Sequence, residues 1–191
     1  MPKIVDHDQY RKELLGKCFN LFAQKGYASL TMRQISESLN VSTGTLYHYF
    51  PNKQSLFEQL VEEISQHDIS SALAEIKGAQ TLSEKMTAIG KFLVKNEDYF
   101  INQTYILVDF YQHQDKETIY NNPVFERVNQ SYQQAVFDFL GVEDPVLTSF
   151  VLSFINGLIL GKLYCDKTID FNEQCALIGK ILTQYLQNQN T

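Results

Sequence analysis

The chain has 191 residues, a formal net charge of −6 at pH 7, and a hydrophobic share of 44%. That hydrophobic share supports a folded core and excludes a chain that is disordered throughout. The longest apolar run, residues 150–163, is interrupted by Ser153, Asn156 and Lys162, and its length and polarity predict that it does not span a bilayer. The first eight residues lack the apolar core of a signal peptide. We therefore expect no membrane partner and a cytoplasmic location.

The charge is distributed unevenly along the chain. Residues 1–55 carry a net charge of +3, and the remaining residues carry −9. A basic amino-terminal part on an acidic remainder can approach phosphates while the remainder is repelled. Because a net charge of +3 is modest, one amino-terminal part is expected to bind DNA weakly, and specific binding is expected to need two such parts.

Apolar residues recur at helical spacing along the whole chain and predict an all-α fold. The first helix is expected from Asp8 to Lys25, with Gly26 as its terminator. Its apolar stripe needs a partner surface, which the next two helices supply, so a small three-helix core is expected. The stripe consists of Leu14, Leu15, Cys18, Phe19 and Phe22.

The segment that follows predicts a short helix with a defined start. Thr31 and Gln34 have the spacing of a capping box, in which each side chain satisfies a free amide at the helix start. Ile35 and Leu39 are four residues apart and share one helix face. Asn40 and Val41 then break the pattern.

A second short helix is predicted directly after this break. Ser42 is well suited to cap it, Leu46 and Phe50 repeat the apolar spacing, and Pro51 ends it. Two short helices joined by a tight turn make a helix-turn-helix. The rest of the second helix carries short donors, hydroxylated rings and a glycine, which favours DNA reading over a helix that only packs on its neighbours.

The run from Leu30 to Lys53, with Phe22–Tyr27 before it and Leu56-Phe57 after it, resembles the DNA-binding signature of the TetR family of transcriptional regulators. The resemblance implies a homodimer with an amino-terminal DNA-binding domain, residues 1–52, and a helical effector-binding and dimerisation domain, residues 53–191. His48-Tyr49 stands where many members have tyrosine and then histidine or tyrosine, so a base preference is not transferred. We expect DNA contacts, most of them at positions implied by the resemblance, from Thr31, Arg33, Ser42, Thr43, Gly44, Thr45, Tyr47, His48, Tyr49 and Lys53.

The remaining chain is predicted to be helical as well. The helix that starts at residue 52 or 53 joins both parts and is the expected lever between them. Further helices are expected over residues 83–93, 97–111, 117–140 or 123–140, 146–165 and 171–187.

An effector pocket is expected among the fourth to seventh helices, because the helix over residues 97–111 is apolar nearly all round. Ordinary core packing explains most of the aromatic side chains of this helix. The alternative is that some of them line an apolar cavity with a few polar anchors for an effector. The candidate effector-binding residues are Phe92, Phe100, Tyr105, Asp109, Phe110, His113, Phe125 and Asn156.

The last two helices are predicted to form a dimer interface. Their apolar stripe is accompanied by Gly157 and Gly161, which permit close helix approach. The alternative is that the stripe packs on the chain's own core, as one of its faces must. The candidate interface residues are Val151, Ile155, Leu158, Ile159, Leu182, Tyr185 and Leu186.

No catalytic or metal-ligating spacing of residues was found, so no enzyme activity, cofactor or metal is expected. The sequence therefore predicts a regulator that represses transcription, binds a palindromic operator as a homodimer and leaves it when a small hydrophobic or aromatic effector binds. The alternative is a helical effector-binding or scaffolding protein that reads no DNA.

Overall fold

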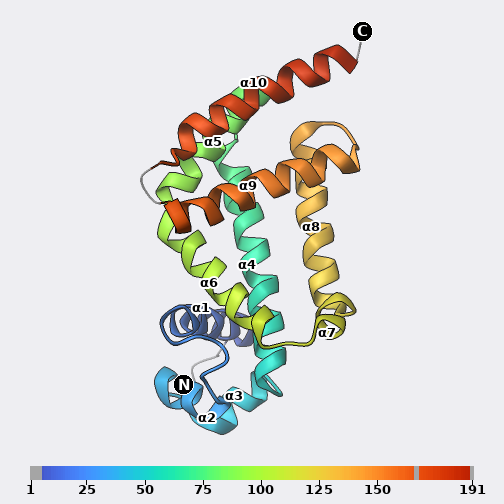
Figure 1. Ribbon diagram of the computed structural model, residues 1–191. Helices are drawn as coiled ribbons and strands as arrows, with labels where there is room; N and C mark the ends of the chain where they lie inside the picture. Colours follow the sequence, from blue (N-terminus) through green and yellow to red (C-terminus); the bar gives the residue numbers. More distant parts are fainter. Residues whose placement is uncertain (1–5, 166–167, 190–191) are drawn as a thin grey trace. The chain divides into compact units, whose positions relative to one another are not determined.

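The computed structural model describes residues 6–165 and 168–189. These residues form helices and no strand, as the sequence predicted (Figure 1). The first half contains α1 (His7–Lys25), α2 (Met32–Leu39), α3 (Thr43–Tyr49), α4 (Lys53–Glu75) and α5 (Leu82–Lys95). The second half contains α6 (Glu97–Gln112), α7 (Lys116–Tyr120), α8 (Pro123–Leu140), α9 (Pro145–Cys165) and α10 (Phe171–Gln189).

Helix boundaries follow local signals. The sequence left open whether a helix starts near residue 117 or at Pro123, and the structure contains both starts as separate helices, α7 and α8. Asn122 separates them because its side-chain oxygen accepts the Val124 N–H at 2.9 Å, as a cap does. Pro123 then occupies the first position of α8, where a missing N–H costs nothing.

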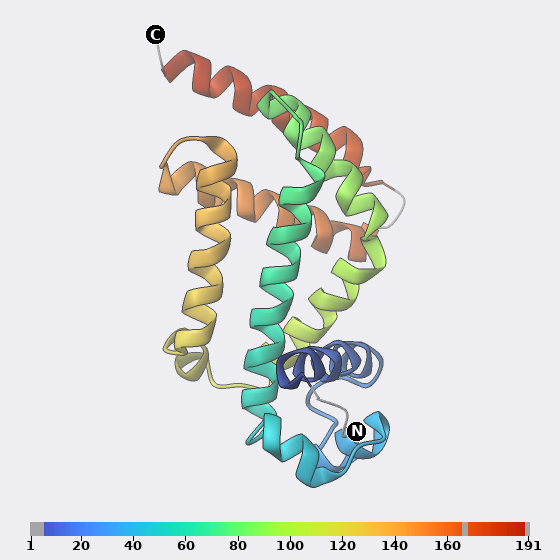
Figure 2. The ribbon, with the colours of Figure 1, turned by 180° about the vertical axis from the view of Figure 1, so that it is seen from behind.

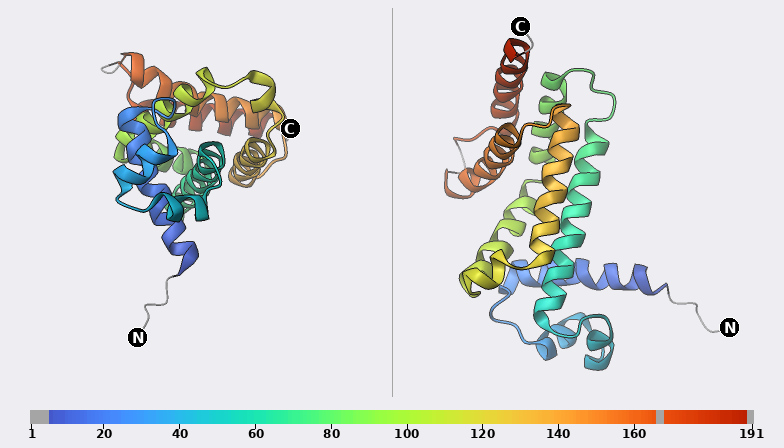
Figure 3. Two further views of the ribbon diagram at one scale, coloured as in Figure 1. Left: turned by 90° about the horizontal axis from the view of Figure 1, so that it is seen from below. Right: turned by 90° about the vertical axis from the view of Figure 1, so that its right-hand side faces the viewer.

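Packing divides the chain into two compact units. The first unit contains the chain up to Gln66 together with Tyr105–Val128, and the second contains His67–Thr104 and the residues from Asn129 on. Each of α4 and α6 is continuous through a unit boundary, and the whole length of α4 is visible in Figure 3. The functional division at residue 52 stays a prediction, since the packing boundary lies further along α4.

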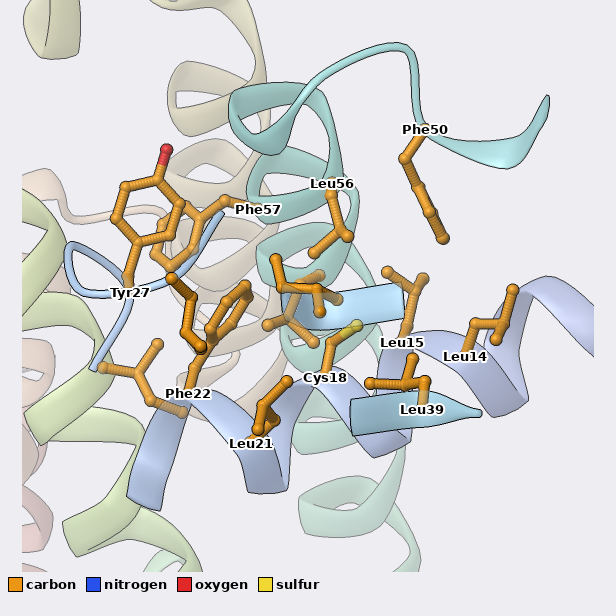
Figure 4. Close-up of a cluster of buried hydrophobic side chains, with 14 of the residues drawn as sticks. Leu14, Leu15, Cys18, Leu21, Phe22, Tyr27, Leu39, Phe50, Leu56 and Phe57 are labelled. Atoms are coloured by element: carbon orange, nitrogen blue, oxygen red, sulfur yellow. The ribbon is translucent and has the colours of Figure 1, made fainter. Parts of the chain in front are cut away.

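The first unit has its core between α1 and the helices that follow it. The apolar stripe of α1 meets α2, α3 and the first turns of α4, as predicted (Figure 4). The end of α6 also belongs to this core, where Phe110 stacks on Phe57 with ring centroids 3.9 Å apart. The additional contact explains how a helix-turn-helix too small for independent stability obtains enough buried surface.

The core of the second unit lies between α5, α6, α9 and α10. Figures 1 and 2 show α5 alongside α10. Two glycines permit this contact: a Cβ at Gly90 would lie 3.0 Å from the Cβ of Cys175, and one at Gly179 would lie 3.0 Å from the Cβ of Met86. Both distances are too short for an ordinary side-chain contact, so α5 and α10 approach closely only because both positions are glycine.

Of the described helices, α9 is long and apolar enough between Pro145 and Tyr164 to cross a membrane by length and composition alone. The apolar stretch is longer than the run over residues 150–163, from which the sequence predicted no span, because α9 begins at Pro145. The helix carries apolar side chains on two faces, of which the unit's own core covers only one. Core helices of soluble proteins can have the same length and composition, so the finding is weak evidence for a membrane.

Candidate nucleic-acid interface

The helix-turn-helix has the hydrogen bonds that the sequence predicted. The Thr31 N–H donates to Oε1 of Gln34 at 2.9 Å, and the Gln34 N–H donates to Oγ1 of Thr31 at 3.3 Å. Asn40 ends α2 with φ of 54°, a left-handed conformation that asparagine adopts more readily than most residues. The Oγ of Ser36 and the Oγ1 of Thr43 lie 3.1 Å apart and connect α2 to α3.

One side of α3 is buried and the other is exposed. Leu46 is fully buried in the core, as expected from its spacing with Phe50. Thr43, Gly44 and His48 are exposed, and 49% of the surface of Tyr47 is accessible. A large aromatic side chain beside small polar groups on an exposed helix face is suited to binding rather than to packing.

Ser42 and Thr45 have a structural role in this region. The Thr45 N–H donates to Oγ of Ser42 at 2.9 Å, and the two hydroxyl oxygens lie 2.7 Å apart. This is the predicted cap at the start of α3. Their hydroxyls are thus already hydrogen-bonded in the free protein, as are those of Thr31, which bonds to Gln34, and of Thr43, which bonds to Ser36.

Lys53 is tied to the loop between α1 and α2. Its ammonium donates to the carbonyl oxygens of Tyr27 at 3.0 Å and Leu30 at 2.8 Å, and lies 4.2 Å from the centre of the Tyr27 ring. Burial lowers the pKa of Lys53, while the nearby carboxylate of Asp109 acts in the opposite direction. Two of its three N–H donors are therefore used inside the unit, and one can reach outward.

Tyr49 and Arg33 are engaged differently from the exposed α3 residues. Tyr49 is partly buried, and its hydroxyl lies 2.8 Å from Nδ1 of His7 at the start of α1. Arg33 pairs with Glu37 one turn later, with Nε and Oε1 2.9 Å apart, and both side chains are largely exposed. The DNA contact expected from Tyr49 therefore competes with its packing in the first unit. The DNA contact expected from Arg33 competes only with a weak surface ion pair.

A cleft of about 660 Å³ adjoins α2 on the same unit. Its lining combines one lysine, one glutamate and small polar side chains, so it presents no single charge. The lining residues are Lys25, Ser29, Leu30, Gln34, Glu37 and Ser38.

The eight candidate effector residues fall into two groups, one in each unit. Phe92 and Phe100 are buried in the second unit, with their ring centroids 5.5 Å apart. Asn156 is exposed on α9 of the same unit. The remaining five belong to the first unit, and these are Tyr105, Asp109, Phe110, His113 and Phe125. Phe110 and Phe125 pack against each other, and Tyr105 and His113 are exposed.

Asp109 has a packing role that its spacing with His113 did not indicate. Its Oδ2 accepts the N–H of Ala28 at 2.9 Å, beside Gly26, whose φ of 78° favours glycine. The predicted pair with His113 is present but loose, with Nδ1 and Oδ1 3.6 Å apart. The carboxylate therefore holds the α1–α2 loop to the end of α6, a long-range contact that an i, i+4 pattern does not reveal.

The candidate dimer residues are mostly buried in the chain's own second core. Val151, Leu158, Ile159 and Leu182 are all less than 9% exposed, whereas Tyr185 is 43% exposed. Ile155 and Leu186 are half-buried. Most of this stripe is therefore buried within the chain's own core, and its part in a dimer interface stays a prediction.

The two glycines of α9 have different surroundings within the chain. The space that a Cβ at Gly161 would need is taken by the side chain of Ile169, and no atom lies near that of Gly157.

A different apolar face of α9 and α10 is exposed. It consists of the pairs Val146/Phe150 and Leu160/Tyr164 on α9 and of Leu177, Ile181 and Tyr185 on α10, with neighbours in each group four residues apart.

Sequence reasoning missed a polar cluster in the second unit. Asp68 on α4 is buried, and its carboxylate accepts hydrogen bonds from Tyr99 and Gln103 on α6 and from Tyr132 on α8. One signal was available, because Asp68 lies four residues after Ile64 in a register that is otherwise apolar.

Comparisons with known proteins agree with this geometry. Residues 14–60 match the family model described as "Bacterial regulatory proteins, tetR family". The chain is 23% identical over 195 residues to the "Probable acrEF/envCD operon repressor" of Escherichia coli (strain K12), covering 94% of this chain and 88% of that protein. It is 33% identical over 52 residues to the "Biofilm operon icaADBC HTH-type negative transcriptional regulator IcaR" of Staphylococcus aureus (strain Newman), covering 27% of this chain and 28% of IcaR.

A solved structure shows the same fold over nearly the whole length. The transcriptional regulator FadR from Bacillus subtilis, in complex with stearoyl-CoA, superposes with a TM-score of 0.67 at 16% identity. The superposition covers 90% of this chain and 96% of FadR. At this identity the likeness shows a common fold, and the ligand of FadR is a property of that protein.

Proposed function

We propose that this chain, which belongs to the TetR family of transcriptional regulators, represses transcription by binding a palindromic operator as a dimer and is released by a small-molecule effector. The observation that carries the proposal is the exposed face of α3, on which Gly44 and Tyr47 stand opposite the buried Leu46. Family members are generally regulators rather than enzymes, and the proposal includes no catalytic step. A DNA-binding role also implies a cytoplasmic location.

Readout of the DNA is assigned to the exposed side chains of α3. Helix-turn-helix proteins insert the second helix into the major groove, where side chains reach base edges and phosphates. Gly44 allows the duplex to approach the backbone, and Thr43, Tyr47 and His48 supply the polar groups. Lys53 has one N–H left for a phosphate after its two internal hydrogen bonds.

Two copies are needed because one DNA-binding part is weakly charged. A net charge of +3 supports few phosphate contacts, and the ion pair with Glu37 occupies Arg33. The exposed apolar face of α9 and α10 is suited to self-association, because burying it removes large apolar side chains from water. A two-fold dimer would place the two copies of α3 on half-sites about 34–36 Å apart or at a multiple of that distance.

Effector release requires only that the effector bind one of two arrangements more tightly. Since α4 is one continuous helix from Lys53 to Glu75, a change near its second half can be passed along it to the helix-turn-helix. A hydrophobic or aromatic effector agrees with the rings of Phe92 and Phe100 in the second unit. The predicted location among the fourth to seventh helices remains part of this proposal.

A helical scaffold that reads no DNA is the competing function, and the acidic charge of the remainder of the chain favours it. Selection of binding sites from random double-stranded DNA separates the two. Enrichment of a palindrome whose binding weakens steeply with salt supports the regulator, and no enriched sequence would eliminate it.

Site-specific variants connect the selected DNA to α3. Tyr47→Ala is expected to reduce affinity for the palindrome about tenfold or more, in the range of a lost base or phosphate contact. Tyr120→Ala is the matched control, because Tyr120 is also an exposed tyrosine, 80% accessible, but lies on α7. Equal losses in both variants would contradict the assignment to α3.

A further inference from the structure

The second unit contains a carboxylate that is buried among tyrosines. Asp68 is 7% exposed, and its Oδ1 accepts the Tyr99 hydroxyl at 2.8 Å. Its Oδ2 accepts the Gln103 amide at 3.0 Å and the Tyr132 hydroxyl at 2.9 Å. The cluster thus joins α4, α6 and α8 through one acidic side chain.

This carboxylate has hydrogen bonds but no ion pair with a lysine or arginine. Within residues 6–165 and 168–189, no lysine or arginine pairs with Asp68. Burial raises the pKa of Asp68, and the three hydrogen bonds and the charge of exposed His67 act in the opposite direction. A buried charge without a counter-charge is costly, so a position that keeps one is a candidate for binding a charged ligand.

The acceptor capacity of the carboxylate is not exhausted. Two carboxylate oxygens offer about four acceptor positions, and three are used here. Gln103 is the donor best suited to exchange, because it forms the longest of the three bonds and is a flexible, neutral amide. Replacing a neutral donor by a cation strengthens the interaction with the carboxylate.

Aromatic rings continue from this carboxylate. Tyr99 contacts Phe100 with ring centroids 5.2 Å apart, and Phe100 contacts Phe92 at 5.5 Å. The ring of His67 lies 5.9 Å from Tyr99. Aromatic faces attract an organic cation electrostatically and also bury its apolar part.

We propose that the effector is an organic ammonium ion with an apolar body, a protonated amine or a quaternary ammonium, whose charge binds beside Asp68. This proposal rests on the effector response proposed above and names the chemical class for it. The cation takes the place of the Gln103 amide and forms an ion pair with the carboxylate, while its apolar body packs against Tyr99 and Phe100. Because the exchange breaks the contact between α4 and α6, the cation favours a different packing of these two helices.

Calorimetric titration tests the class of ligand with four probes that share a benzyl group. These are benzylammonium, benzyltrimethylammonium, benzyl alcohol and benzoate. The expected result is that one or both cations bind, and that the neutral and anionic probes bind at least about tenfold more weakly. A preference for benzylammonium indicates a protonated amine, and a preference for benzyltrimethylammonium indicates a quaternary ammonium. Absence of binding by both cations at millimolar concentration, or tighter binding of benzoate, would overturn the proposal.

Variants of the full-length protein test the site. Asp68→Asn keeps the size and the hydrogen-bonding shape but removes the charge, and is expected to weaken cation binding at least about tenfold. Gln103→Leu retains the carboxylate and removes the amide that the cation displaces, so it is expected to bind the cation as well as the wild type or better. If circular dichroism shows that Asp68→Asn is unfolded, the result for Gln103→Leu decides alone. A weaker affinity of Gln103→Leu for the cation than that of the wild type then counts against the exchange of the amide for the cation.

DNA binding is measured separately on the same variants. Asp68→Asn is expected to retain the affinity for the selected palindrome while losing the response to the cation. If no DNA is selected at all but cations bind beside Asp68, the regulator fails and the ligand class stands. If DNA is bound and a folded Asp68→Asn binds the cations like the wild type, the ligand site fails and the regulator stands.

Discussion

Gly44→Ala is the sharpest test of how α3 is used, because the free protein has room for the added methyl group. A Cβ at this position would lie 3.7 Å from Oγ of Ser42, an ordinary contact distance, with no other neighbour within 4 Å. Alanine in a helix is more stable than glycine by about 0.5–1 kcal/mol. The variant is therefore expected to unfold at the same urea concentration as the wild type or at a higher one.

The same methyl group is expected to obstruct the duplex. Inserting a methylene into a well-packed interface costs about 1–3 kcal/mol, which lowers affinity about 5- to 150-fold for one copy of α3. Two copies in a dimer double this free energy, to about 2–6 kcal/mol for the complex. The expected result is thus a folded dimer with severely reduced operator binding.

Gel-shift titration of the selected palindrome measures the loss, and Gly16→Ala is the matched control. Gly16 is an exposed glycine inside α1, outside the helix-turn-helix, and a Cβ there would have no neighbour within 4 Å. It is expected to gain the same stability and to keep wild-type DNA affinity. Wild-type affinity in Gly44→Ala would refute the close approach of DNA to α3.

Three further outcomes are expected. Lys53→Met loses two charge-assisted hydrogen bonds to the α1–α2 loop, so urea unfolding is expected to show about 1–3 kcal/mol less stability. The slope of log affinity for DNA against log salt concentration is expected to become shallower by about one unit. Unchanged stability would show that the loop does not need Lys53. Phe150→Glu with Ile181→Glu is expected to give a folded monomer in sedimentation, because both side chains are exposed on α9 and α10, and a variant that stays dimeric would exclude this face. Burial raises the pKa of Tyr27 to about 12, so the folded state retains a proton that the unfolded state releases above pH 10. The free energy of unfolding is therefore expected to fall between pH 10 and 12, and to fall less steeply in Tyr27→Phe than in the wild type. Equal slopes in the two proteins would contradict the shift.

The structure also changes what is expected of Lys53 and of the candidate dimer residues. Lys53 was expected from the sequence to contact DNA, and the structure shows that its ammonium is also hydrogen-bonded inside the first unit. Leu158 was a candidate interface residue, but it is 8% exposed and belongs to the chain's own core. A charge there is expected to unfold the second unit rather than to separate two copies.

The sequence by itself determined the helices and the helix-turn-helix. The Thr31–Gln34 capping box and the Ser42 cap each depend on residues three apart. Such interactions are complete before any other part of the chain is in place, so local spacing is sufficient to predict them. The family resemblance depended on the same short segment.

Only the tertiary structure decided which side of each helix is covered. The stripes of α9 look equivalent in the sequence, and Val151 is buried while Phe150 is exposed only because of how the other helices of the second unit pack against α9. Asp68 is a further case, since its partners Tyr99 and Tyr132 are 31 and 64 residues away. Burial and long-range hydrogen bonds depend on which helices meet, and no pattern within a single helix carries that information.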